Sequence, residues 1–152
     1  MDQFDSIRPY NDSEVATVLQ RLLADVDFLS IITHYRFPKA SRYLGSLLRP
    51  MIAHKLRAEV AGVNSVAALQ ERIEPYVERS ITQATDGISF SGIEHLQLGQ
   101  PHLYIANHRD IVMDPAFVNY ALFQAKHATP RIAIGDNLLQ RPFVSDLMRI
   151  NK

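Results

Sequence analysis

The chain has 152 residues, with 16 Lys and Arg against 16 Asp and Glu, six His and no Cys. This length suits one domain with a sizeable core, and the lack of Cys excludes disulfides, thiolate zinc sites and a cysteine nucleophile. A zero net charge argues against nucleic acid as a partner, because binding to a phosphate backbone usually needs a basic domain. Residues 1–5 lack the basic and apolar regions of a signal peptide, and no stretch has the length and apolarity of a membrane-spanning helix.

The first half of the chain has the apolar spacing of helices. Asn11, with Glu14 three residues on, resembles a capping box and predicts the start of a helix. Pro38 predicts a break, and Pro50 predicts a kink or a new start in the next helical segment. Gly62 fits the position just past the end of that segment. We therefore expect residues 1–86 to form a helical region.

The second half predicts strands between helices. Residues 88–93 alternate with period two, and residues 102–106 and 131–135 are short apolar runs typical of strands. Residues 115–126 and 137–150 have helical patterns. A helix between two strands is long enough for a parallel crossover. The fold class expected is α/β, with an N-terminal helical layer followed by the start of a mainly parallel sheet with flanking helices.

The expected sheet has only three strands, fewer than a parallel sheet normally contains. The chain stops at Asn151-Lys152, directly after a predicted helix, where another strand would be expected. We therefore expect residues 87–152 to be the first part of an α/β domain that is truncated at its C-terminus.

Charge is distributed unevenly in the first half. Residues 1–27 carry six acids and two bases, whereas residues 28–57 carry no acid and six bases: Arg36, Lys39, Arg42, Arg49, Lys55 and Arg57. A basic amphipathic helix of this kind can lie on an anionic bilayer surface. The alternative is an ordinary solvated helix face whose apolar side packs into the domain.

The densest polar cluster, residues 107–110 followed by Asp114, comes directly after the predicted strand 102–106. Ligand sites of open α/β sheets collect at the carboxyl ends of strands. A His with a carboxylate partner can act as a general base, and here the base would be His108. The structural alternative is that Asp114 caps a helix with Pro115 at its first position.

The segment 104–115, which reads YIANHRDIVMDP, resembles the first motif of the glycerolipid acyltransferases. This family includes the bacterial acylglycerol-phosphate and glycerol-3-phosphate acyltransferases, and residues 135–139 also look like its bacterial branch. The resemblance implies that His108 deprotonates a glycerol hydroxyl for attack on an acyl thioester, with Asp114 as its orienting partner. Asn107 and Arg109 are expected to contact the substrate.

The same resemblance implies acyl-CoA or acyl carrier protein as cosubstrate and glycerol-3-phosphate or its 1-acyl form as acceptor. It implies a role in phospholipid synthesis with no cofactor and no metal. The expected location is cytoplasmic, on the inner face of the cell membrane, with residues 28–57 against the lipid surface.

The chain departs from the family pattern in two ways. Five residues separate His108 from Asp114, where the family commonly has four. A bulge can absorb the extra residue, which favours Asp114 as the partner over Asp110. The later family motifs, an Arg-bearing strand and a Glu-Gly-Thr-Arg-like segment, have no counterpart, so the resemblance covers mainly residues 85–152.

The sequence leaves two other functions open. A metal-dependent phosphoesterase would use as ligands Asn107, His108, Asp110, Asp114 and Asp136. In that class, however, the Gly-Asp element precedes the Asn-His element, and here the order is reversed. The other is a truncated, non-enzymatic module that binds membranes or a partner through its basic helix.

Overall fold

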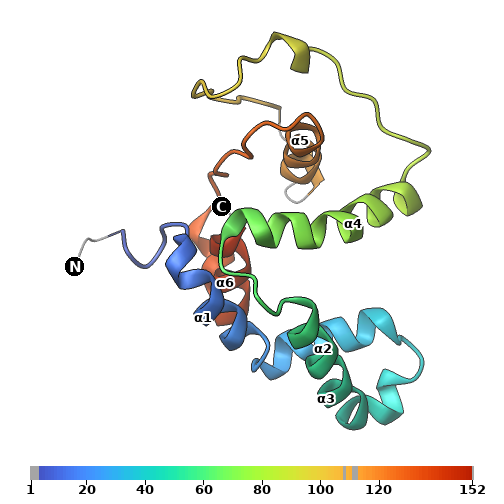
Figure 1. Ribbon diagram of the computed structural model, residues 1–152. Helices are drawn as coiled ribbons and strands as arrows, with labels where there is room; N and C mark the ends of the chain where they lie inside the picture. The colour runs from blue at the N-terminus through green and yellow to red at the C-terminus, as the bar shows by residue number, and fades with distance from the viewer. Residues whose placement is uncertain (1–3, 108, 111–112, 152) are drawn as a thin grey trace. The chain divides into compact units, whose positions relative to one another are not determined.

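A computed structural model describes residues 4–107, 109–110 and 113–151 of the chain. In this part of the chain the regular structure is helical (Figure 1). The α-helices are α1 (Asp12–Leu22), α2 (Val26–Arg36), α3 (Ser41–Glu59), α4 (Val66–Ala84), α5 (Met113–Gln124) and α6 (Pro142–Ile150). Two short 3-10 helices, η1 (Ile93–His95) and η2 (Asp136–Leu139), lie before α5 and α6.

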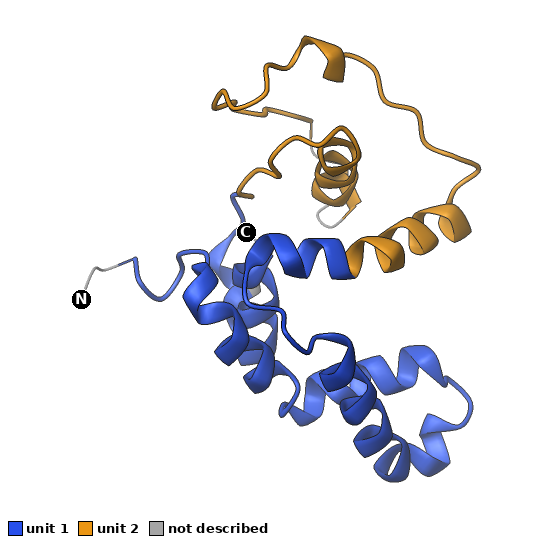
Figure 2. Ribbon diagram, in the orientation of Figure 1, with its two compact units in different colours: residues 1–72, 133–152 blue, residues 73–132 orange. Residues whose placement is uncertain are grey.

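The chain divides into two compact units (Figure 2). Unit 1 combines residues 1–72 with residues 133–152, and unit 2 consists of residues 73–132. Helix α4 runs from the first unit into the second. The two ends of the sequence therefore belong to the same unit, although the domain boundary predicted after residue 86 stays a prediction.

The local signals of the first half are confirmed. Helix α1 begins directly after Asn11, whose N–H donates to the Glu14 carboxylate at 2.8 Å. Helix α2 ends at Arg36, just before Pro38. Gly62 follows the end of α3 with φ +80°, a left-handed conformation that favours glycine.

Helix α3 differs from its predicted form. It continues through Pro50, and its departure from helical geometry lies at Leu44 (φ −117°, ψ 15°). Ile52 and Ala53 are buried, whereas Leu47 is 73% exposed. Only some of the apolar side chains of α3 therefore pack into the protein.

Unit 1 holds most of the buried apolar side chains. Helices α2 and α3 pack side by side, and α1 packs against α6 (Figure 1). The rings of Phe28 on α2 and Phe143 on α6 lie 6.3 Å apart between centroids. The buried side chains of this unit are Val15, Val18, Leu19, Leu22, Leu23, Leu29, Ile52, Ala53, Val63, Val66, Leu69, Phe143 and Ile150.

Unit 2 has a smaller interior. Ile81 on α4 and Leu122 on α5 are buried, and the rings of Phe90 and Tyr120 lie 6.2 Å apart between centroids. The Gln124 side chain donates a hydrogen bond of 2.8 Å to the Glu74 carboxylate, which joins α5 to α4.

The predicted α/β fold with a parallel sheet is wrong. Throughout the described residues no β-strand is present, so neither the sheet nor its strand–helix–strand crossover forms. Residues 88–91, 101–107 and 131–135 have irregular structure, while the helix predicted between the last two is present as α5.

The physical reason is that alternation and apolar runs report only a side-chain pattern. A strand exists when its backbone N–H and C=O groups pair with a neighbouring segment. The three predicted strands do not pair with one another, and Leu103 and Ile105 of the second are 87% and 88% exposed. Leu103 and Ile105 thus gain little of the burial that stabilises a strand.

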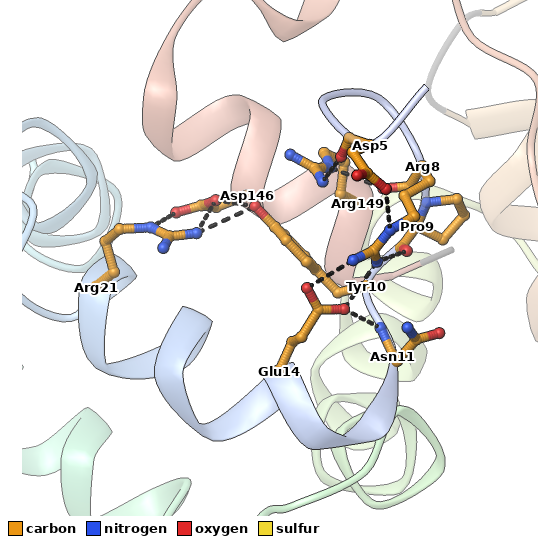
Figure 3. Close-up of polar contacts among 9 residues, drawn as sticks. All are labelled: Asp5, Arg8, Pro9, Tyr10, Asn11, Glu14, Arg21, Asp146 and Arg149. Carbon is orange, nitrogen blue, oxygen red and sulfur yellow. Dashed lines mark hydrogen bonds and ion pairs between the residues drawn. The ribbon is translucent and has the colours of Figure 1, made fainter. Parts of the chain in front are cut away.

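A buried carboxylate on α6 holds the two ends of unit 1 together (Figure 3). Asp146 is 5% exposed, and its two carboxylate oxygens accept hydrogen bonds of 2.6 Å from Nε and Nη2 of Arg21. The Tyr10 hydroxyl donates to the same carboxylate at 2.7 Å. We call Tyr10, Arg21, Asp146 and Arg149 the Asp146 cluster.

Arg149 completes this cluster from the same helix. Its guanidinium carbon lies 4.2 Å from the centroid of the Tyr10 ring, and its nitrogens donate to the carbonyls of Arg8 and Asp5 at 2.8 Å each. The Tyr10 N–H donates in turn to the Arg149 carbonyl at 2.9 Å. The segment before α1 is therefore fastened along α6.

The surroundings of Asp146 favour its charged form. Burial acts to raise the pKa of Asp146, but the hydrogen bonds from Arg21 and Tyr10 outweigh burial, and the pKa lies below its ordinary value. At the start of α1, hydrogen bonds from Arg8 and from the Asn11 N–H lower the pKa of Glu14 to about 2.

Removing the Arg21 guanidinium will destabilise unit 1 more than neutralising Asp146. Arg21→Ala leaves a buried carboxylate without its cation, a change that costs about 3 kcal/mol in comparable sites. Asp146→Asn removes the charge itself and costs about 1 kcal/mol. Urea unfolding followed by circular dichroism measures both values, and an equal or opposite order would contradict this account of the cluster.

Stability will also fall in acid. A carboxylate whose pKa is lower in the folded state stabilises the fold above its unfolded pKa, and this contribution is lost as the pH falls from about 4 through the folded value. Asp146 and Glu14 both have lowered pKa values. Thermal unfolding between neutral pH and pH 3 measures the loss. The loss of stability in acid should be smaller in Arg21→Ala. Without the ion pair, burial alone raises the pKa of Asp146, so its protonation no longer destabilises the fold.

Candidate functional site

The polar cluster lies in unit 2, in the turn that leads into α5. The predicted base, His108, lies outside the described residues. Asn107 and Arg109, the predicted substrate contacts, are exposed on either side of it. Asp114, its predicted partner, is half-buried in the first turn of α5.

The Asp114 carboxylate organises this turn. Its Oδ2 atom accepts hydrogen bonds from the N–H of Arg109 at 2.7 Å and of Asp110 at 2.8 Å. These donors belong to the two residues that directly follow position 108. The carboxylate also lies where the positive end of the helix dipole favours negative charge. Asp114 is thereby held against the backbone next to the predicted base.

Asp110 has a different role. Its side chain accepts a hydrogen bond of 2.7 Å from the Met113 N–H, and its carbonyl accepts one of 3.3 Å from the Asp114 N–H. These are the bonds of a helix N-cap. The structural alternative in the sequence, which put Asp114 at the cap, is therefore corrected: the Asp110 side chain accepts from Met113 at the start of α5, and Asp114 lies in the first turn of the helix.

Both carboxylates stand out in the sequence, but their different roles do not. Asp110, five residues before the predicted helix 115–126, was a usable signal, because Asp is among the preferred N-cap residues. The motif spacing drew attention to Asp114 instead. In this turn the Asp110 carboxylate accepts from Met113 at the start of the helix, and the Asp114 carboxylate accepts from the N–H of Arg109, the residue after position 108.

Metal binding gains no support from the described side chains. Within residues 4–107, 109–110 and 113–151, no group of three or more His, Asp or Glu is placed to hold a metal ion. Asp136, one of the ligands considered for a phosphoesterase, belongs to unit 1, whereas Asp110 and Asp114 belong to unit 2.

Part of the chain is similar to a known protein family. Residues 87–152 match the family model described as Acyltransferase. The match supports a general acyltransferase function and includes the turn with Asp110 and Asp114. Searches of curated proteins and of solved structures gave no significant match.

The matched segment is not confined to one compact unit. Residues 87–132 lie in unit 2, whereas residues 133–152, with α6 and its Asp146, lie in unit 1. The N-terminal helices therefore pack directly on the end of the acyltransferase segment, through the Asp146 cluster.

As for membranes, the helices of the described residues include none with both the length and the apolarity to cross a bilayer.

The two carboxylates of the turn accept hydrogen bonds from different backbone amides, so each should slow hydrogen exchange at a different place. Asp114→Ala should speed hydrogen exchange at the amides of Arg109 and Asp110, because both donate to its side chain. Asp110→Ala should do so at Met113 and lower helix stability by about 1 kcal/mol, a typical cost of losing an N-cap. Amide exchange by NMR measures both effects. Unchanged exchange at Arg109 in Asp114→Ala would contradict the described turn.

Proposed function

We propose that the chain carries the catalytic turn of an O-acyltransferase that acylates a glycerol phosphate in phospholipid synthesis. The observation that carries the proposal is the family match over residues 87–152, which contains the Asn107-His108 pair and the Asp114-Pro115 pair of the resembled motif. The donor is acyl-CoA or acyl carrier protein, and the acceptor is glycerol-3-phosphate or its 1-acyl form.

In the proposed reaction His108 is the general base. Its imidazole takes the proton from an acceptor hydroxyl while the oxygen attacks the thioester carbonyl. The tetrahedral intermediate collapses with cleavage of the carbon–sulfur bond. The thiolate leaves and recovers the proton from the imidazolium, so the base returns to its starting form and no cofactor is consumed.

Asp114 is proposed to orient that imidazole. A carboxylate partner selects one tautomer of a catalytic His and stabilises the imidazolium as it forms. Asp114 accepts hydrogen bonds from the N–H groups of Arg109 and Asp110, directly after position 108, and this favours it over Asp110, whose carboxylate accepts from Met113. Asn107 and Arg109 are proposed to contact the acceptor, with the Arg109 guanidinium suited to its phosphate.

The test is acyl transfer from acyl-CoA or acyl carrier protein to glycerol-3-phosphate and to its 1-acyl form. His108→Ala should lower the rate about 100- to 10,000-fold, the usual contribution of a general base. His95→Ala is the matched control, since His95 is exposed on η1 and should leave activity unchanged. Activity that survives His108→Ala would remove the proposed base.

The same assay separates the two carboxylates. Asp114→Asn should lower the rate more than Asp110→Asn, because only the first is proposed to act on the imidazole. A larger loss in Asp110→Asn would transfer the partner role to Asp110. No transfer by the unaltered chain to either acceptor would contradict the proposal and favour a binding module without catalysis.

A further inference from the structure

The α2–α3 hairpin of unit 1 carries apolar side chains on its outer surface. On α3, Tyr43, Leu47 and Met51 follow one another at four-residue spacing and are 82%, 73% and 52% exposed. Residues four apart lie on one face of a helix, so Leu47 and Met51 share a face, and Tyr43 comes just before it, on the other side of the non-helical Leu44. On α2, Ile31 and Tyr35 have the same spacing and are 51% and 76% exposed. Both helices therefore present apolar faces to solvent.

The turn of this hairpin is basic. Arg36, Lys39 and Arg42 flank or form the connection between the helices, and all three are exposed. No salt bridge joins them to an acid in the described part of the chain. The other bases of residues 28–57 are engaged: the side chains of Arg49 and Arg57 donate to Ser30 Oγ and the Leu23 carbonyl, and Lys55 pairs with Glu59.

We propose that the α2–α3 hairpin is a docking surface for an anionic lipid bilayer. The exposed α3 face (Tyr43, Leu47 and Met51) enters the interface, and the basic turn (Arg36, Lys39 and Arg42) lies among the lipid headgroups. The basic stretch 28–57 thus binds as a helical hairpin, not as one flat helix. This inference does not depend on the proposed acyl transfer.

Charge and side-chain type favour lipid over a second copy of the chain. Residues 28–57 contain no acid, so two hairpins face to face would bring bases against bases, whereas anionic headgroups neutralise them. Tyr at the edge of an apolar stripe suits the membrane interface, because its ring is apolar and its hydroxyl reaches water. The exposed side chains of Leu47 and Met51 supply the apolar contact with the lipid.

Vesicle cosedimentation of the full 152-residue chain tests the proposal. The chain should bind vesicles of phosphatidylglycerol and phosphatidylethanolamine more tightly than vesicles of phosphatidylcholine. Binding should weaken at about 1 M salt, where the screening length falls to about 3 Å. Absence of binding to the anionic vesicles would overturn the proposal and favour an acidic protein as the occupant of the hairpin.

Matched variants test which part of the chain makes the contact. Lys39→Ala with Arg42→Ala should lower the partition coefficient about 25-fold, from about fivefold for each base near an anionic surface. Arg72→Ala with Arg79→Ala changes the net charge equally on α4 and should have little effect. Leu47→Ser should weaken binding roughly tenfold, and Leu98→Ser, at a similarly exposed leucine in unit 2, should not. Equal effects within either pair would overturn the assignment to the hairpin.

A tryptophan reports on insertion directly, since the chain has none of its own. Emission of Tyr43→Trp should shift to the blue on addition of anionic vesicles, and emission of Leu98→Trp should stay unchanged. No shift at position 43 would overturn insertion of the α3 face. His108→Ala should bind vesicles as the unaltered chain does, so failure of acyl transfer and failure of membrane docking are separate results.

Discussion

Unit 1 depends on one buried charge. Asp146 comes from the segment that matches the acyltransferase family, while Arg21 and Tyr10 come from the opposite end of the sequence. A carboxylate that is 5% exposed is tolerated only when a cation and hydrogen-bond donors replace its lost water, and these two side chains supply both. The ion pair between Arg21 and Asp146 joins α1 to α6. The contact between Phe28 and Phe143 joins α2 to α6 as well, so the start of α2 and the end of the segment that matches the family share one core.

The turn before α5 shows how two neighbouring carboxylates are given different tasks. Asp110 satisfies the start of the helix at Met113, and Asp114 holds the backbone of Arg109 and Asp110. A helix start leaves several N–H groups without partners inside the helix, so acids collect there for structural reasons alone. A structural role does not exclude a chemical one: the bonds that fix Asp114 also fix the chain immediately beyond position 108, which is what the proposed acyl transfer requires of a positioning group.

The proposed catalytic turn and the proposed membrane hairpin lie in different compact units, and each has its own physical basis. The turn relies on directed hydrogen bonds at a helix start. The hairpin relies on exposed apolar side chains and on three bases, Arg36, Lys39 and Arg42, that form no salt bridge with the described acids. The two proposals together describe a chain that takes part in acyl transfer and binds to a lipid surface.

The amino-acid sequence by itself determined the features set by neighbours in the chain. The capping pair Asn11 and Glu14 starts α1, Pro38 separates α2 from α3, and Gly62 follows the end of α3, because each acts within a few residues. Features that need a distant partner were decided by tertiary structure. Leu103 and Ile105 read as a strand, yet a strand requires a paired backbone that no local pattern supplies. The apolar spacing of α3 predicts a helix but not which side chains are buried, and the structure buries Ile52 and Ala53 while it exposes Leu47. The partner of Asp146, Arg21, lies 125 residues away in the sequence.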